Sequence, residues 1–457
     1  MAEGVTSPTH PTQVRHSMIF ITMIVAVLLY LDRICLSTAG VSIQQDLKIS
    51  EKELEWVLGS FFITYALAQL PAGWLGDRYG ARWMLTAYLM LWSLCTGLSG
   101  IVTGLTGLLV LRLACGLFEA GAYPVAAGVV TRWTPLSGRG LASGIIAVGG
   151  RIGGAIAPAL TGFLMIWWAG GAQSPELVTS WRPVMMLYGI VGIIVGVIFW
   201  AIYRDWPRQH PLVNEQEVTL IEGNHPPRMN RKSLELPPLR QMLTNRSLWA
   251  NSFVQFSSNL GWAFLVTSLP LYLRDAHQTE LQNAGLKQSI PLFMGIGGLL
   301  FGGILTDWIT RRTGLRWSRS IPSILSRFIV GLGFLGCAFL QAEWQVLVML
   351  AIIGFATDMA TPSVWAYGQD VARNHVGAVV GWANMIGNFG AAASPIVMGE
   401  IRRSFHDPVT GWRMAFFSFA ALQIAATVAA FWIDASKPLV PTTESPSTDS
   451  ESKNPTP

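Results

Sequence analysis

The feature that most constrains the fold is a series of continuous apolar runs, each roughly 20 residues long. A helix of about that length crosses a bilayer core about 30 Å thick, because each helical residue adds about 1.5 Å. The runs are continuous rather than alternating, which disfavours a transmembrane barrel. Charged residues make up only 12% of the 457 residues, against about 25% in an average soluble protein. The sequence therefore predicts an all-α integral membrane protein.

We predict twelve membrane-spanning helices in two six-helix repeats. Their predicted ranges are 17–39, 54–76, 82–103, 105–130, 141–166, 183–203, 247–273, 289–308, 318–340, 343–366, 376–400 and 411–433. The repeat is clearest between the fifth and eleventh ranges, where four glycines and a proline recur at a constant offset of 237 residues. Secondary transporters are often built this way, with the substrate site near the midplane between the repeats.

The predicted helices divide the chain into five segments. These are an N-terminal tail (1–16), a six-helix domain (17–203), a central loop (204–246), a second six-helix domain (247–433) and a disordered tail (434–457). With both termini in the cytoplasm, the cytoplasmic segments and their flanks hold 19 Lys and Arg residues and the outside segments hold 8. The positive-inside rule therefore predicts that both termini and the central loop are cytoplasmic. We expect a multi-pass plasma-membrane protein, in the inner membrane if the source is Gram-negative.

Two charges lie inside the fourth apolar run. Arg112 and Glu119 are seven positions apart, and at about 100° per residue they share one helical stripe with Gly116 and Tyr123. An isolated ionised group is costly in a bilayer, so such residues normally face a protein interior or a water-filled cavity. This segment is therefore a candidate functional site.

Two interpretations of these charges stay open, and both include Asp32 and Arg33 of the first run. In one, the four residues are mutually neutralised ion pairs that fix helix packing. In the other, Arg33 and Arg112 bind a substrate carboxylate through their guanidinium forks. Asp32 and Glu119 then exchange protons, because a buried carboxylate that loses its arginine to a substrate anion is stabilised by protonation.

Further candidates are polar residues at membrane depth. Arg151 lies among the glycines of 149–154, which allow a ligand or a neighbouring backbone to approach closely; we predict that it binds substrate, and helix packing is the alternative. Asn388 aligns with Arg151 in the repeat and Asn384 lies one turn away, so both are predicted to bind substrate. Tyr65 is predicted to bind substrate through its hydroxyl, or else to make a helix–helix contact.

Two further charges lie at membrane depth in the second half. Asp358 precedes Pro362, where a broken helix would expose backbone groups, and it is either functional or a hydrogen-bonded helix contact. Arg327 lies about two turns from the basic end of the ninth run, so we expect its side chain to extend toward that end.

Other classes of function find no support in the sequence. We find no P-loop, nucleophile elbow or metal-ligand spacing, so we expect no enzyme, cofactor or metal site. The four cysteines lie in apolar runs and are predicted to be packing residues. Basic residues that fix loops on the cytoplasmic side account for the basic character of the chain, so we expect no nucleic-acid partner. The expected partners are an organic anion, protons and lipid, and the chain is expected to be a monomer.

A loop after the second run resembles the signature of the major facilitator superfamily. It reads Gly73-Trp-Leu-Gly-Asp77-Arg78-Tyr-Gly80-Ala-Arg82. A partial copy at 303–312 keeps an aspartate and an arginine but lacks the central glycine. The resemblance implies the major facilitator fold. It also implies that these five named residues form a latch that stabilises the outward-open state, with the charge relay carried by the aspartate and the two arginines.

Within that superfamily, three stretches are similar to the anion:cation symporter family. They contain Asp32-Arg33, the segment from Arg112 through Glu119, and Gly-Asn388-Phe-Gly. The resemblance implies proton-coupled import of a sugar acid such as a hexuronate, aldonate or aldarate, with the arginines serving the carboxylate and the acids serving protonation. Arg151 departs from the small or amide residue expected there, which suggests a second acidic group on the substrate or a shifted pocket.

Three other functions fit the sequence less well. An organophosphate or phosphate exchanger would favour a partner arginine in the seventh run, which has none between 247 and 273. Drug export fits poorly with five charges in the core of the first half. A non-transporting membrane sensor would need a signalling domain, and neither the central loop nor the short tail contains a recognisable one.

Overall fold

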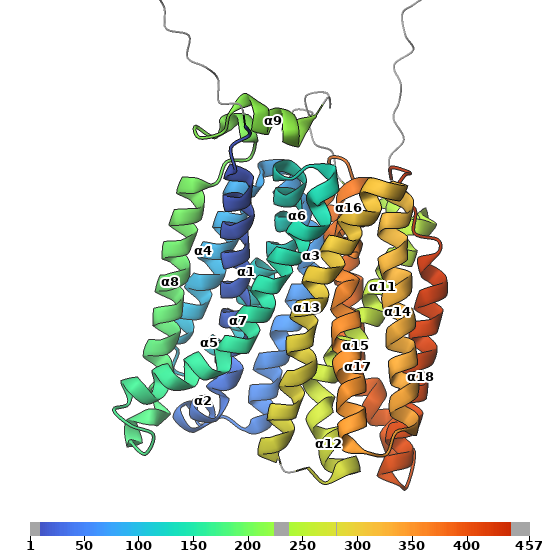
Figure 1. Ribbon diagram of the computed structural model, residues 1–457. Helices are drawn as coiled ribbons and strands as arrows, with labels where there is room; N and C mark the ends of the chain where they lie inside the picture. The colour runs from blue at the N-terminus through green and yellow to red at the C-terminus, as the bar shows by residue number, and fades with distance from the viewer. Residues whose placement is uncertain (1–9, 224–236, 280, 440–457) are drawn as a thin grey trace, which may run out of the picture.

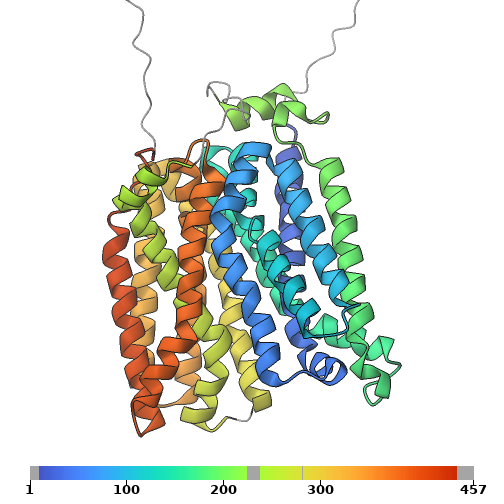
Figure 2. The same cartoon turned by 180° about the vertical axis from the view of Figure 1, so that it is seen from behind.

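A computed structural model describes residues 10–223, 237–279 and 281–439, and all of their regular secondary structure is helical. The N-terminal half of the chain forms one side of the bundle and the C-terminal half forms the other (Figure 1, Figure 2). The helix α9 lies beyond one end of the bundle, which we call the α9 face, while α2 and α12 lie at the opposite end (Figure 1).

The helices of the N-terminal half are followed by three short helices in the described part of the central segment. Their bounds are α1 (Val14–Thr38), α2 (Gly40–Leu47), α3 (Glu51–Tyr79), α4 (Ala81–Ser99), α5 (Leu105–Glu119), α6 (Ala122–Trp133), η1 (Leu136–Gly138), α7 (Arg139–Trp168), η2 (Pro175–Val178), α8 (Trp181–Ile202), η3 (Pro207–Gln209), α9 (Glu215–Glu222) and α10 (Leu239–Thr244).

The C-terminal half contains eight further helices and one π-helical turn, η5, among the described residues. Their bounds are α11 (Arg246–Ala263), η5 (Phe264–Ser268), α12 (Leu269–His277), α13 (Leu281–Thr313), α14 (Leu315–Phe339), α15 (Glu343–Met359), α16 (Thr361–Val371), α17 (Val376–Arg403) and α18 (Pro408–Ala430).

Each of the twelve predicted spans coincides with a helix or a run of helices in the described chain. Eight of these segments are long and apolar enough to cross a membrane by length and composition. The other four, α3, α4, α11–α12 and α17, pack against these helices within the bundle. The polar residues that lower their hydropathy include groups that bind across the bundle, as described below.

The fourth helix of each half is broken at a proline. Pro124 stands near the start of α6 and Pro362 near the start of α16. Proline has no N–H to donate to the carbonyl four residues earlier, so the helix is interrupted there. As a result α5 ends at Glu119, and α15 ends one residue after Asp358. Both breaks therefore place a carboxylate at a helix end deep in the bundle.

The central segment is folded back onto the start of the chain. Glu217 of α9 is fully buried and accepts hydrogen bonds from Thr12 Oγ1 at 2.6 Å and from the backbone N–H groups of Val14 and Arg15 at 3.2 and 3.1 Å. Arg15 Nη1 also pairs with it at 3.0 Å. The carboxylate thus satisfies the free N–H groups at the start of α1, where the helix dipole favours a negative charge.

The tail that was predicted to be disordered from residue 434 is ordered at its start. Asp434 N donates to Ser247 Oγ at 2.8 Å, and Leu439 N donates to Val371 O at 2.9 Å. Leu439 is buried against the core. The prediction was wrong for 434–439 because its polar composition did not reveal these apolar anchors; residues 440–457 lie outside the described chain.

The two halves approach each other closely near the α9 face. A Cβ atom added to Gly73 of α3 would lie 2.1 Å from Gly377 O of α17. In the matching place of the repeat, a Cβ on Gly140 of α7 would lie 2.9 Å from Gly303 O of α13. Only glycine permits backbones to come so near, so these positions allow the halves to close on each other at this face.

Candidate functional site

The Arg33–Glu119 ion pair lies at the centre of the N-terminal half. Arg33 Nε donates to Glu119 Oε1 at 2.8 Å, and Nη2 donates to the same oxygen. Glu119 is fully buried, and its Oε2 has no hydrogen-bond partner among the described residues. A carboxylate held through one oxygen retains a free oxygen that can accept a proton.

Three aromatic rings surround the Arg33 guanidinium. Its Cζ lies 4.4 Å from the ring centre of Tyr65, 4.9 Å from that of Tyr30 and 5.1 Å from that of Phe61. Cation–π contacts of this kind hold the charge in place without neutralising it. Tyr65, predicted to bind substrate, lies beside the predicted anion-binding arginine and stacks on Phe61. Its contact with a substrate remains a prediction.

Asp32 and Arg112 occupy a separate pocket. Neighbouring residues of a helix point about 100° apart, so Asp32 faces away from the Arg33 pair. Asp32 Oδ2 accepts from Trp92 Nε1 at 3.0 Å, and Arg112 Nη2 donates to Arg33 O at 2.9 Å. Asp32 and Arg112 line one small cavity inside the N-terminal half. The four predicted residues thus form one ion pair and one polar pocket joined through the Arg33 backbone.

A second ion pair joins the two halves. Arg151 of α7 donates from Nε to Asp358 Oδ2 at 2.9 Å and from Nη2 to Asp358 Oδ1 at 2.6 Å. Arg151 is twelve residues beyond the start of α7, or about 18 Å along its axis, near the middle of this 30-residue helix. Its Cζ also lies 4.8 Å from the ring centre of Trp262. Sequence spacing gave no sign of the Arg151–Asp358 pairing.

Arg327 does not extend toward the helix end as expected. Its side chain is fully buried. Nη2 donates to Ser326 Oγ at 2.7 Å and to Thr357 O at 3.0 Å, while Nη1 donates to Gln423 Oε1 at 3.1 Å. Partners on α15 and α18 make burial possible, and they were not visible in the sequence of α14 alone.

The two asparagines of α17 bind within the C-terminal half. Asn384 Oδ1 accepts a hydrogen bond from Gln255 Nε2 of α11, and Asn388 Nδ2 donates to Asn384 O at 2.8 Å. Asn384 is buried and Asn388 is half-buried. Gln255 was missed because single polar residues in apolar helices are common helix contacts. The predicted substrate contacts of both asparagines stay predictions.

Two aspartates bind across the halves at the α9 face. Asp77 of α3 accepts hydrogen bonds from Gly377 N at 2.8 Å and Ala378 N at 3.0 Å, at the start of α17. Asp307 of α13 accepts from Gly140 N at 2.8 Å and from Leu141 N at 2.9 Å, at the start of α7. Each carboxylate therefore satisfies the free N–H groups of a helix in the opposite half.

The other predicted latch residues lie around the turn between α3 and α4. Gly80 forms this turn with φ +95°, a conformation that favours glycine. Arg82 Nε donates to Trp200 O at 3.0 Å. The Arg78 Cζ atom lies 5.4 Å from the ring centre of Trp74. The structure thus brings Gly73 and Asp77 into the interface, and it leaves the relay role of Arg78 and Arg82 as a prediction.

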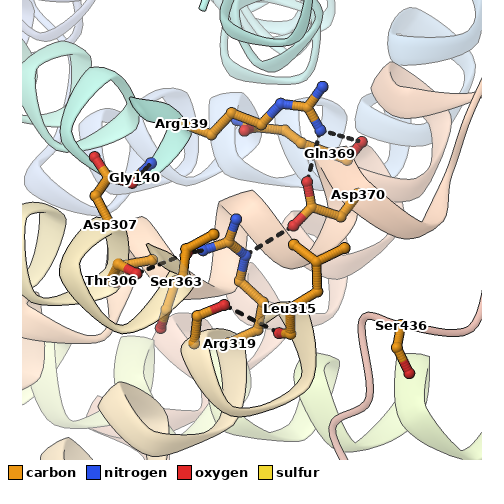
Figure 3. Close-up of polar contacts among 12 residues, drawn as sticks. Arg139, Gly140, Thr306, Asp307, Leu315, Arg319, Ser363, Gln369, Asp370 and Ser436 are labelled. Carbon is orange, nitrogen blue, oxygen red and sulfur yellow. Dashed lines mark hydrogen bonds and ion pairs between the residues drawn. The ribbon is translucent and has the colours of Figure 1, made fainter. Parts of the chain in front are cut away.

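A buried charge network at the α9 face was missed from the sequence. Asp370 of α16 accepts from Arg139 Nη1 of the opposite half at 2.6 Å and from Arg319 Nε of α14 at 2.8 Å (Figure 3). Arg319 and Asp370 are fully buried side chains. Asp370 lies beyond the end of the predicted tenth span (343–366), so it is not among the charges predicted at membrane depth.

Comparison with known proteins places this architecture in a family. The profile of the Major Facilitator Superfamily matches residues 22–395. The chain is 29% identical to the probable galactarate/D-glucarate transporter of Bacillus subtilis, with 87% of this chain and 88% of that protein covered. It is also 29% identical to the probable sulfoacetate transporter of Cupriavidus necator, with 85% and 87% covered. A structure of a proton:xylose symporter has a TM-score of 0.67 at 14% identity, covering 91% of this chain and 94% of that one. The predicted twelve-helix fold is confirmed, and the chain belongs to the Major Facilitator Superfamily, as a membrane transporter rather than an enzyme.

Proposed function

We propose that this transporter is a proton-coupled symporter that imports an organic anion, most simply a sugar acid such as a hexuronate, aldonate or aldarate. The names of the relatives support an organic anion, because galactarate, glucarate and sulfoacetate are all anions. The two arginines and two acids of the N-terminal half supply the charges that this function needs.

The observation that carries the proposal is the Arg33–Glu119 pair. The guanidinium group that binds the Glu119 carboxylate can bind a substrate carboxylate in the same way. A substrate carboxylate therefore competes directly with Glu119 for Arg33. If the substrate wins, Glu119 is left buried without its cation, which costs about 3–5 kcal/mol while it remains ionised. Protonation at the released carboxylate removes that cost. Anion binding and proton binding thereby favour each other.

Asp32 is the second proposed proton-binding group. Its Oδ1 is buried and has no hydrogen-bond partner among the described residues, and it shares a cavity with Arg112. Arg112 holds the backbone of Arg33, so we propose that it orients the anion-binding arginine as well as supplying charge. Proton uptake at Asp32 would then act on Arg33 through Arg112.

Transport requires the site to face each side in turn. We propose that residues 17–203 and 247–433 move as two units about the central site. The two aspartate caps and the Arg139–Asp370 pair hold them together at the α9 face, and releasing these contacts would open that face. We assign the α9 face to the cytoplasm, since the segments assigned to it carry most of the Lys and Arg residues.

Uptake by purified protein in liposomes tests the proposal. A panel of labelled sugar acids would be offered with and without an inward proton gradient. We expect accumulation of at least one sugar acid above its outside concentration only when the gradient is present. Equal uptake in both conditions would overturn symport, and failure to transport any member of the panel would overturn the substrate class.

A further inference from the structure

The Arg151–Asp358 pair has the form of an occupied anion site. Both oxygens of one carboxylate meet two nitrogens of one guanidinium, at 2.9 and 2.6 Å. This is the bidentate geometry in which arginine binds a carboxylate of a ligand. Arg151 is the more accessible partner, with 18% of its side chain exposed against 6% for Asp358. Arg151 therefore offers more accessible surface to an incoming anion than Asp358 does.

The surroundings of the pair are shaped around it. A Cβ atom on Gly295 of α13 would lie only 2.4 Å from Asp358 Oδ2, so the glycine leaves the space that the carboxylate occupies. The Trp262 ring covers the guanidinium from the C-terminal half. On the other side, the Tyr30 ring centre lies 4.9 Å from Arg33 Cζ, and Tyr30 Cε2 would lie 2.8 Å from a Cβ atom on Gly150, the residue before Arg151. One phenol thus lies close to both arginine–carboxylate pairs.

The charges around Asp358 have a net positive excess, which favours binding of one more anion. Arg327 of α14 acts electrostatically on Asp358 from within the C-terminal half, and it donates to the carbonyl of the preceding residue, Thr357. Arg151, Asp358 and Arg327 together carry one excess positive charge. An anionic group that takes Arg151 therefore neutralises this group of three, and Asp358 keeps Arg327 as a neighbouring cation. A buried excess charge of this kind favours an anionic ligand.

We propose that Arg151 is the binding subsite for the second anionic group of a dianionic substrate, and that Asp358 occupies this subsite in the empty transporter. The inference rests on the proposed function, in which the first carboxylate binds at Arg33. The substrate then spans the two arginines past Tyr30, and Asp358 is displaced from the guanidinium. A monoanionic substrate with a hydroxymethyl group at its far end leaves the Arg151–Asp358 pair intact.

The test compares an aldarate with the aldonate of the same sugar, which differ only in whether the far end is a carboxylate or a hydroxymethyl group. Binding of each to the full-length protein in detergent would be measured by calorimetry. For Arg151→Gln we expect aldarate affinity to fall by roughly tenfold or more, with aldonate affinity nearly unchanged, because charge-assisted bonds to one end are lost. For Arg151→Lys we expect an intermediate loss, since the charge remains and the fork does not.

Asp358→Asn distinguishes this subsite from a purely structural ion pair. Removing the competing carboxylate frees Arg151, so we expect the aldarate to bind more tightly than to the wild type, whereas loss of a structural contact predicts weaker binding. The double variant Arg151→Gln/Asp358→Asn removes both charges of this pair, and we expect it to bind the aldonate without any preference for the aldarate.

The outcomes distinguish failure of the Arg151 subsite from failure of the proposed function. If the wild type binds both acids and Arg151→Gln weakens both equally, the subsite is refuted while the proposed function stands. Weaker aldarate binding by Asp358→Asn would refute it as well. If the wild type binds neither these acids nor any other sugar acid, the proposed function itself fails and the subsite fails with it.

Discussion

Removing the Asp77 carboxylate provides a sharp test of how the halves are held together. Asp77 accepts two backbone hydrogen bonds from the start of α17, at 2.8 and 3.0 Å. The substitution Asp77→Asn keeps one acceptor oxygen but loses the negative charge and one of these bonds. The affected bonds join opposite halves, so they exist only while the α9 face is closed. The change therefore destabilises the closed arrangement relative to the open one.

The size of the effect follows from the strength of these bonds. A hydrogen bond to a charged group contributes about 1.5–3 kcal/mol to stability. Loss of one such bond shifts the equilibrium toward opening at the α9 face by roughly 12- to 160-fold, since each 1.36 kcal/mol is about tenfold. Asp307 still binds the start of α7 in the variant. We therefore expect a shifted conformational equilibrium rather than an unfolded protein.

The distance between spin labels across the α9 face measures the shift. Leu136 and Arg312 are exposed, and their elements η1 and α13 are in contact across the halves. The four native cysteines are buried, so labels will react preferentially with cysteines introduced at these two sites. We expect the Asp77→Asn variant to show a larger population at the longer distance than the unsubstituted protein.

Asp407→Asn is the matched control for this experiment. Asp407 accepts from Val409 N at 3.2 Å and Thr410 N at 2.9 Å, so it also binds two N–H groups at the start of a helix. It lies in the same half as the helix that it caps, α18. An unchanged distance distribution for Asp77→Asn, or an equal shift for Asp407→Asn, would refute the role of Asp77 in closing this face.

Three further variants test the proton-coupling residue, the buried charge network and the close approach of the two halves. Glu119→Gln should abolish proton-driven accumulation but keep substrate exchange in counterflow; undiminished concentrative uptake would remove Glu119 from the mechanism. Asp370→Asn leaves the buried Arg319 without its carboxylate and should cost about 3–5 kcal/mol, seen as a lower thermal unfolding temperature in detergent; unchanged stability would contradict this. Gly377→Ala would place its Cβ 2.3 Å from Gly73 O and should open the α9 face, whereas an unchanged label distance would show that the helices can adjust.

The fold was largely predictable because the membrane imposes helix length. Apolar runs of about 20 residues predict spans, and the glycines and prolines that recur between 144–162 and 381–399 predict the repeat. Composition did not predict that the start of the C-terminal tail is ordered, because a few apolar residues anchor it. Leu439 packs into the core from a tail whose other residues are mostly polar.

Pairings between distant residues were harder to predict. Arg151 and Asp358 are 207 positions apart, and no helical period relates them. The sequence marks each as a costly charge at membrane depth, but the partner depends on how α7 and α15 pack. Arg327 shows the same limit, because its buried position depends on Gln423 of α18.

The sequence also did not predict which residues pair within the charge cluster of the N-terminal half. Helical spacing places Asp32 and Arg33 about 100° apart, so their side chains leave the helix in different directions. Spacing alone does not tell which of them meets Glu119. In the structure Arg33 takes that position, while Asp32 meets Trp92 of α4. The assignment depends on how the helices of the N-terminal half are arranged, which sets the positions of Glu119 at the end of α5 and Trp92 of α4 relative to α1.

Counting protons and substrate together tests the central claim most directly. Purified transporter in liposomes would be given a labelled sugar acid, and the pH of a weakly buffered interior would be followed as the acid enters. We expect entry of the acid to carry protons inward, and an imposed inward proton gradient to drive the acid above its outside concentration. Sugar-acid entry without proton movement, at the same rate with and without the gradient, would contradict proton-coupled symport.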